Sequence, residues 1–298
     1  MPPFRIQFAG NLFVDLSHDH FSKFVRPNHS PYLALLGNIG NPHNPKTSHF
    51  LEYCAKHWNR VFWVAGPHEL GHSGCDAYNP TFRDNMDLME SIAKPYNVDV
   101  LTQNGRVVDG VQIVGATLWT PVSNHRVEDK YSQPEFTTIH KFNGPISPID
   151  LAEWNAEDVA FLSSKLTNEK PTVVLTHHLP HPSLYSPLLS VKAHKRMGLD
   201  TTNVSTLLHE PCKLWLSGAS GGSAVGVFGS NTVAVVNSMY EFPKHPSADR
   251  NPFYSPEMYA ELNASPYLPY RVCHLVSTQT FRTECEGSSN QKINEQLR

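Results

Sequence analysis

The sequence predicts an α/β fold built from two packed sheets, and the succession of apolar runs and helical patterns is the main reason. A first set of buried strands is indicated by apolar runs at 6–9, 32–36 and 60–65. A helix with an apolar face is expected at 47–58, between the second and third of these runs. Further strands are expected at 98–101, 106–108, 111–118, 172–175, 213–216, 226–228 and 232–236. Strands that alternate with helices are typical of α/β domains, whose ligand chemistry lies at strand ends.

The remaining segments complete one domain with an insertion and a tail. Residues 80–93 predict a helix with proline in its first turn, and residues 150–166 predict another that begins with a capping box. Residues 121–148 are polar, with prolines and scattered aromatic residues, which indicates a long insertion. The pattern of elements weakens near the end of the chain. We therefore expect one domain over 1–256 and a C-terminal extension over 257–298.

Composition argues against several classes of function. The 298 residues carry a formal net charge of −3, which disfavours a nucleic-acid-binding protein. No run approaches the roughly 20 apolar residues that span a bilayer, and the first residues lack the apolar core of a signal peptide. The five cysteines form no C-x-x-C pair, so neither a zinc ribbon nor a disulfide framework is indicated. We expect an intracellular, cytoplasmic protein that is not secreted and has no membrane or nucleic-acid partner.

Short segments marked by glycine or histidine follow the predicted strands. In chain order they are Gly10-Asn11-Leu12-Phe13, Gly37-Asn38, Gly66-Pro67-His68-Glu69, His177-His178 and Gly218-Ala219-Ser220-Gly221. Their order and setting resemble the signature segments of the calcineurin-like metallophosphoesterases, which read D-x-H, G-D, G-N-H-[DE], a lone H and G-H-x-H. The resemblance covers about 4–256. It implies a four-layer α/β/β/α sandwich of two mixed sheets, with the site on the loops after the strands.

The resemblance also implies which positions would bind metal, and this chain departs from the family at nearly all of them. His177 keeps the residue type of the family's ligand. The degenerate ligand positions are Asn11, Phe13, Asn38, Pro67, Ala219 and Gly221. Such enzymes hold two metals about 3.5–4 Å apart with carboxylate and imidazole ligands. The two asparagines have lost the charge of aspartate, so the resemblance implies a catalytically inactive member without a cofactor.

Histidines near these positions leave one metal-dependent alternative open. His68 matches the family's catalytic histidine, which protonates the leaving group, and we expect it to be vestigial. At most one adventitious divalent metal is expected near His177, with His178, His181 and His68 as further ligands. A residual metal-dependent phosphoesterase with a remodelled site around His177 is therefore an alternative function.

Other notable side chains receive structural interpretations. Metal-capable residues at the N-terminal end, which we interpret as a solvated polar face, are Asp15, His18, Asp19 and His20. The tryptophans that we expect in the core are Trp58, Trp63, Trp154 and Trp215. The aromatic residues of 131–142 are expected to be exposed and available for partner contacts.

The segment from His68 to His72 reads H-E-L-G-H, a literal match to the zinc-protease motif H-E-x-x-H. That motif requires a helix, which places both imidazoles on one face, and a third ligand further along the chain. Here it follows a strand directly, and Gly71 interrupts it. Cys75 stands where the longer metzincin motif needs glycine. We interpret the match as coincidental.

The segment 218–222 reads G-A-S-G-G, which matches the G-x-S-x-G nucleophile elbow of serine hydrolases. An elbow needs a helix immediately after the serine, whereas the residues that follow Ser220 predict a strand. Glu241 or Asp249 with His274 would formally complete a triad. A serine hydrolase that uses Ser220 therefore remains a second alternative.

A structural or protein-interaction scaffold is the first functional hypothesis. The resemblance implies a precedent, since the family includes a scaffold subunit of retromer that uses this fold for protein contacts. The insertion and the C-terminal extension are suited to docking in a larger assembly, such as a virus particle. We expect one or more protein partners for this pseudoenzyme.

Overall fold

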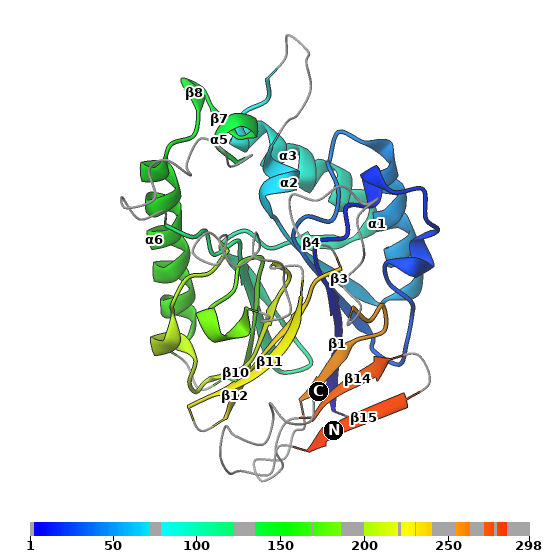
Figure 1. Ribbon diagram of the computed structural model, residues 1–298. Helices are drawn as coiled ribbons and strands as arrows, with labels where there is room; N and C mark the ends of the chain where they lie inside the picture. The colour runs from blue at the N-terminus through cyan, green and yellow to red at the C-terminus, as the bar shows by residue number, and fades with distance from the viewer. Residues whose placement is uncertain are drawn as a thin grey trace.

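The computed structural model describes residues 3–71, 79–121, 135–167, 170–185, 200–219, 222–229, 231–239, 254–262, 271–276 and 279–284. Two mixed sheets pack face to face at the centre, and helices cover the outer face of each sheet (Figure 1). This arrangement confirms the predicted four-layer α/β/β/α sandwich.

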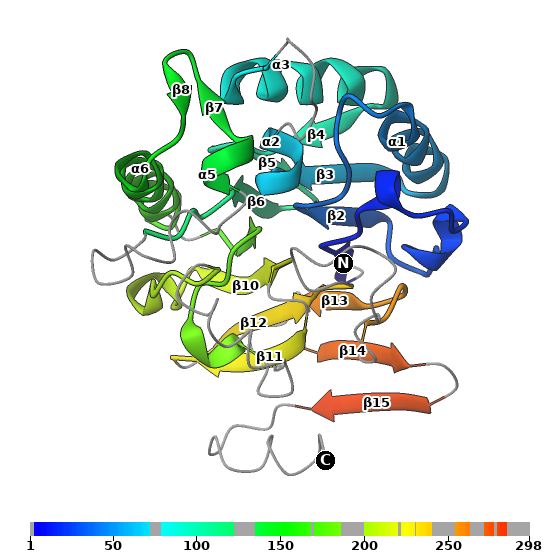
Figure 2. The same cartoon turned by 45° about the horizontal axis from the view of Figure 1, so that its top comes forward.

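The first sheet has seven strands in the order β15-β14-β13-β1-β2-β3-β4. Their bounds are β1 Phe4–Ala9, β2 Tyr32–Leu36, β3 Arg60–Val64, β4 Val98–Val100, β13 Tyr259–Leu262, β14 Arg271–Val276 and β15 Gln279–Glu284. Strands β1 to β4 are parallel, and β13 joins β1 in the antiparallel direction. The segment expected as a C-terminal extension thus supplies three strands of this sheet, which Figure 2 shows continuing beyond β1.

The second sheet has six strands in the order β11-β12-β10-β9-β6-β5. Their bounds are β5 Asn104–Val108, β6 Val111–Ala116, β9 Thr172–Thr176, β10 Cys212–Ser217, β11 Ser223–Phe228 and β12 Thr232–Asn237. The four central strands β6, β9, β10 and β12 are parallel, and β5 and β11 are antiparallel edge strands. The carboxyl ends of the parallel strands therefore lie at one edge.

The described helices are α1 Pro45–His57, α2 Pro67–Leu70, α3 Phe82–Ala93, α5 Glu135–Thr138 and α6 Pro148–Lys165, and the short 3₁₀ segments are η1 Val14–Leu16, η2 Phe21–Lys23, η3 Lys94–Tyr96, η5 Pro182–Leu184 and η6 Ser205–Leu207. The three longer helices, α1, α3 and α6, begin at side-chain caps provided by Asn44, Thr81 and Ser147. Helix α6 starts two residues earlier than predicted, because Ser147 and Asp150 form its capping box. Among the residues that the structure places, no helix is long and apolar enough to span a bilayer.

Apolar side chains on both faces of the strands create three core clusters. In β2, Leu33 and Leu35 face α1 and α3, whereas Leu36 faces the second sheet. The layer between the two sheets is made mainly of strand residues such as Phe8 and Leu216, and α6 covers the third cluster. The predicted core tryptophans Trp58, Trp63 and Trp215 are buried, and Trp154 is partly buried against the first cluster.

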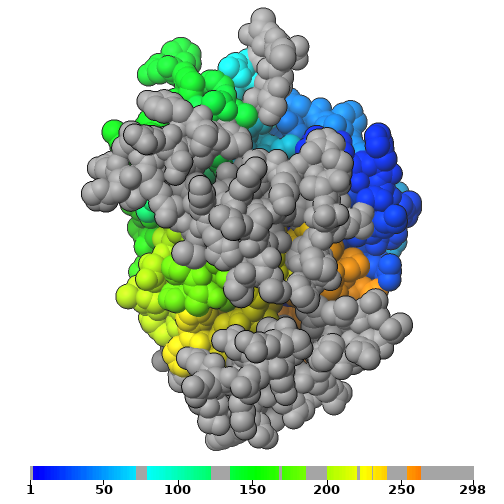
Figure 3. All heavy atoms as spheres, in the orientation of Figure 1, coloured from blue at the N-terminus to red at the C-terminus, as the bar shows by residue number. Residues whose placement is uncertain are grey.

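The insertion expected at 121–148 contains α5 and a hairpin of β7 (His140–Lys141) and β8 (Gly144–Pro145). The hairpin stands out from the body beside the start of α6 (Figure 3). Phe142 at its turn is 96% exposed, as predicted for this segment, whereas Phe136 is buried. Residues 122–134 lie outside the described part of the chain.

Candidate functional site

The turns after β1 and β2 hold the first candidate residues in an unusual backbone conformation. Asn11, Phe13 and Asn38 are left-handed, with φ angles of 53°, 47° and 53°. Asparagine tolerates this region, whereas it strains a phenylalanine. Gly37 has a φ of 76°, and a Cβ there would lie 2.4 Å from His177 Nδ1. These turns therefore bring the first sheet into direct contact with a residue carried by the second.

The two asparagines that stand at aspartate positions form the centre of a buried hydrogen-bonded chain. The backbone N–H of His68 donates to Asn38 Oδ1 at 2.8 Å, and Asn38 Nδ2 donates to Asn11 Oδ1 at 3.0 Å. Asn11 Nδ2 then donates to Ser238 Oγ at 2.9 Å. Both asparagines are 1% exposed. Each amide oxygen therefore already accepts a hydrogen bond from the protein itself.

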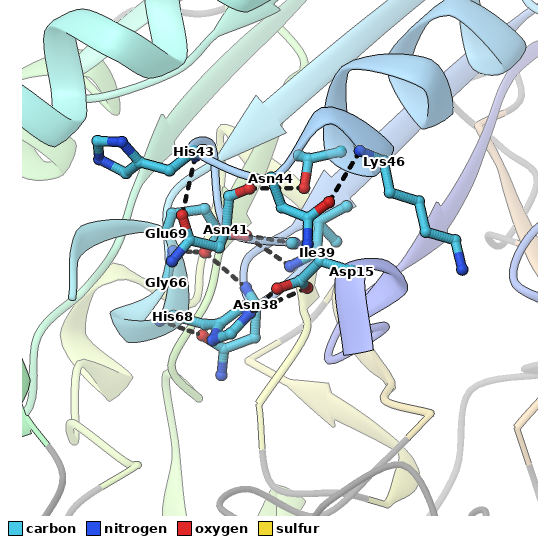
Figure 4. Close-up of polar contacts among 12 residues, drawn as sticks. Asp15, Asn38, Ile39, Asn41, His43, Asn44, Lys46, Gly66, His68 and Glu69 are labelled. Carbon is cyan, nitrogen blue, oxygen red and sulfur yellow. Dashed lines mark hydrogen bonds and ion pairs between the residues drawn. The ribbon is translucent and has the colours of Figure 1, made fainter. Parts of the chain in front are cut away.

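Glu69 is a fully buried carboxylate that binds backbone N–H groups from two loops (Figure 4). Its Oε2 accepts from Asn38 and Gly66, each at 2.8 Å, and its Oε1 accepts from Ile39 at 2.5 Å and Gly40 at 3.2 Å. Burial raises the pKa of Glu69, while the charge of His68 and the backbone N–H groups act in the opposite direction. This carboxylate clamps the turn after β2 to the start of α2.

His68 projects from α2 toward Asp15 of η1 (Figure 4). Its Nε2 lies 3.0 Å from both carboxylate oxygens of Asp15, whose side chain is only 3% exposed. Burial lowers the pKa of His68, but the hydrogen bond to Asp15 and the charges of Asp15 and Glu69 outweigh it, so the pKa lies above its ordinary value. The Nε2 atom of His68, through which the side chain would donate a proton to a leaving group, is therefore already in contact with Asp15.

His177 follows β9 and is buried between the sheets. Its Nδ1 donates to the carbonyl oxygen of Leu36 at 2.8 Å, so the free lone pair is on Nε2. Burial, with a contribution from neighbouring His178, lowers the pKa of His177 to about 3, and the ring is neutral at pH 7. His178 Nδ1 instead lies 3.0 Å from Thr120 Oγ1. The two adjacent imidazoles thus have separate hydrogen-bond partners.

The other positions that the resemblance implied as ligands have structural contacts. Phe13 is 2% exposed, belongs to the core cluster beneath α1 and α3, and meets the ring of His68 edge-on at 5.0 Å. Pro67 is the first residue of α2. The Ala219 N–H donates to the His177 carbonyl at 2.8 Å. Gly221 lies outside the described residues.

A dinuclear metal centre does not fit these side chains. Divalent metals of this class need several carboxylate or imidazole ligands with free lone pairs. Asn11 and Asn38 offer no charge, and their amide oxygens already accept hydrogen bonds. Glu69 is enclosed by backbone N–H groups and Asp15 by His68. Within the described part of the chain, no group of three or more His, Cys, Asp or Glu side chains is placed to hold a metal ion.

The two competing motifs also lack their required structural context. Only the first three residues of the H-E-x-x-H match lie on a helix, the four-residue α2, and its Glu69 is buried against backbone N–H groups. His72 lies outside the described residues. Ser220 also lies outside them, together with Glu241 and Asp249, and nothing is described of the His274 side chain. The segment after Ser220 continues as strand β11, not as the helix of a nucleophile elbow.

Three residues of this site were not identified as such from the sequence. Asp15 was interpreted as part of a solvated face, yet it is buried against His68. Ser238 follows β12 and has no motif around it. In the sequence, Glu69 was noted only as the acid of the G-N-H-[DE] and H-E-x-x-H patterns. Its clamp on backbone N–H groups is a long-range contact that motif spacing does not show.

Comparisons with known proteins bear on the fold. No protein-family model matches the chain. A phosphopantetheinyl hydrolase from Mycobacterium tuberculosis superposes with a TM-score of 0.63 at 16% identity, over 89% of this chain and 98% of that one. A dimetal phosphatase from Danio rerio superposes with a TM-score of 0.50 at 14% identity, over 92% of this chain and 95% of that one. The fold is metallophosphoesterase-like.

A sequence relative comes from a giant virus. The chain is 25% identical over 255 residues to "Uncharacterized protein L509" of Acanthamoeba polyphaga mimivirus, which covers 80% of this chain and 86% of that protein. The match therefore spans most of both chains, but that protein's name gives no activity.

Proposed function

We propose that this protein is a catalytically inactive, metallophosphoesterase-like scaffold that functions through protein contacts. The observation that carries the proposal is the neutral chain from His68 through Asn38 and Asn11 to Ser238. In this chain, N–H groups donate hydrogen bonds to the amide oxygens of Asn11 and Asn38, which are the atoms that metal ions would need as ligands. The two solved structures that share the fold are named as a hydrolase and a phosphatase, so the loss of ligands concerns this chain and not the fold.

The charge of the site also disfavours phosphate chemistry. A phosphate ester near His68 would also meet the carboxylate of Asp15, which offsets any positive charge on the imidazole and so leaves no net attraction for the ester. His177 remains neutral at pH 7 and offers no positive charge. A phosphoesterase mechanism would therefore lack both the activated water and the electrostatic stabilisation of the leaving oxygen.

The scaffold role is supported by surface features and by the viral relative. The β7–β8 hairpin presents Phe142 almost fully to solvent, and an exposed aromatic side chain at a turn is suited to anchor a protein contact. The relative from mimivirus favours a setting in which proteins assemble into large particles. We infer an intracellular protein whose partners are proteins, within a larger assembly such as a virus particle.

Metal content tests this proposal directly. Protein purified without a histidine tag is soaked in manganese, desalted and analysed by plasma mass spectrometry. Fewer than about 0.2 equivalents of manganese per chain are expected, because the site lacks the ligands that would hold metal. So little metal would make a two-metal mechanism untenable, since it needs both ions. Near two equivalents would refute catalytic inactivity. One equivalent would instead favour the alternative of a remodelled phosphoesterase site at His177. An activity assay with a phosphodiester substrate would then test that alternative.

A revertant provides the matched control. It restores the ligand residues of the family through Asn11→Asp, Phe13→His, Asn38→Asp, Pro67→Asn, Ala219→His and Gly221→His. Gain of metal in this variant alone shows that the ligands, and not the scaffold, limit binding. A fluorophosphonate probe that labels the unaltered protein at Ser220 would instead support the serine hydrolase alternative.

A further inference from the structure

The carboxyl ends of the two sheets are joined by polar side chains in a regular order. Three residues that end or follow strands of the second sheet each donate to a carbonyl at the end of a strand of the first. Asn237 Nδ2 donates to Phe8 O at 2.8 Å, His177 Nδ1 to Leu36 O at 2.8 Å, and Thr117 Oγ1 to Ala65 O at 3.0 Å. The contacts therefore pair β12 with β1, β9 with β2, and β6 with β3.

The order of these contacts follows the order of the strands in both sheets. Strands β1, β2 and β3 are consecutive neighbours, and β12, β9 and β6 occur in the same sequence across the interface, with β10 between the first two. The Asn11–Ser238 hydrogen bond adds a fourth contact at the β1–β12 end. We call this set the sheet seam: Thr117, His177, Asn237 and the Asn11–Ser238 pair.

All the seam side chains are buried and the backbones beneath them touch. Each is at most 4% exposed. The Gly10 N–H donates to the Asn237 carbonyl, and the Met239 N–H donates to the Gly10 carbonyl, both at 3.0 Å. A Cβ on Gly218 would lie 2.0 Å from Leu36 O. A backbone carbonyl at a strand end needs a partner when it is buried, and the seam supplies one for each of the three strands.

We propose that the sheet seam performs the structural task that metal ions would perform at this edge, by holding loops of the two sheets together as one cooperative unit. The inference rests on the proposed function, because a site that binds metal would not need this task to be replaced. The ligand positions that the resemblance implied come from loops of both sheets, so an ion there would join the sheets. Here neutral hydrogen bonds join them, and His177 acts as a seam donor with its Nδ1.

A double-mutant cycle in EDTA tests whether the seam is one unit. Thr117→Val removes a hydroxyl at one end, and Ser238→Ala removes one at the other. Each change should lower the midpoint of thermal unfolding by about 2–4 °C, the shift that one lost hydrogen bond produces in a protein of this size. Together they should lower it by clearly less than the sum, because opening one end already releases the other.

Thr232→Val is the matched control. Thr232 is also buried, and its Oγ1 donates to the Cys212 carbonyl at 2.7 Å, but both residues belong to the second sheet. Its effect should add fully to that of Ser238→Ala. Full additivity in both pairs would refute the cooperative seam.

Two further measurements separate this inference from the proposed function. Manganese should leave the unfolding midpoint of the unaltered protein within about 1 °C of its value in EDTA, since only a ligand that binds the folded state raises it. A rise of the unfolding midpoint on addition of manganese would refute the proposed inactivity, whereas additive mutant cycles would refute only the seam.

If a variant fails to fold, hydrogen exchange of the unaltered protein in EDTA tests the seam instead. Amides of Gly10, Asn11 and Ala219 should then exchange only through global unfolding, and fast exchange there would refute the seam.

Discussion

Replacing Glu69 with glutamine tests the clamp that the buried carboxylate forms between the turn after β2 and the start of α2. Glu69→Gln keeps the size of the side chain and one oxygen, which can still accept two of the four backbone N–H groups. The other two N–H groups then face an NH₂ group, which cannot accept. A buried donor without its acceptor costs about 1–3 kcal/mol, so the expected loss is roughly 2–6 kcal/mol in the free energy of unfolding.

The assay is thermal unfolding followed by calorimetry at pH 7. A loss of 1 kcal/mol lowers the midpoint by about 2–4 °C in a protein of this size, so we expect a drop between about 4 and 24 °C. Glu52→Gln is the control, because Glu52 is on the outer face of α1 and its side chain is 42% exposed. Its midpoint should change by no more than about 2 °C, since an exposed pair contributes little. An equally small change for Glu69→Gln would refute the clamp.

Two further predictions concern titrating groups of the same region. Asp15→Asn should lower the pKa of His68, because the carboxylate that raises it is gone, and NMR titration will measure this change. The raised pKa of the folded state stabilises the protein below the ordinary pKa of about 6.5, and this contribution is lost as pH rises through the folded value. The variant should therefore lose most stability in acid, which unfolding measured against pH will show. Burial raises the pKa of Asp158 to about 6, so its carboxylate costs stability as pH rises from about 4 to above 6. Asp158→Asn should remove that pH dependence while Gln103 turns its amide to remain a partner, and an unchanged slope of unfolding free energy against pH would contradict the assignment.

The strands and helices could be predicted because their signals are local. Buried parallel strands such as β2 and β9 appear as short apolar runs, and α1 shows its apolar face at helical spacing. Strands β13 to β15 were not predicted, and β11 begins three residues before its predicted start. The start of α6 was also misplaced, because its capping box lies at Ser147 and Asp150, three residues before the predicted one. A second S/T/D-x-x-acid pattern in the following turn made the two starts indistinguishable by sequence.

The site was predictable in its backbone and unpredictable in its partners. The loops after β1, β2 and β9 were located from the glycines and from the resemblance, and the structure places Asn11, Asn38 and His177 at one edge. Ser238 was not found, because it contacts Asn11 across 227 positions and no local pattern marks a single serine. Asp15 was misinterpreted because acid and histidine neighbours suggest solvent exposure, whereas its actual partner is on a different element.

The close approach of Gly10, Gly218 and Leu36 has a consequence for how the molecule presents its surface. With no side chain between the backbones, a Cβ on Gly10 would lie only 2.3 Å from the Cα of Gly218. The two sheets have no room to slide or rotate against each other at this edge, since packed backbones do not deform gradually. The described residues that follow β1, β2 and β10 are therefore held at a fixed spacing although different sheets carry them, so a molecule that contacted both sheets there would not need to order either first.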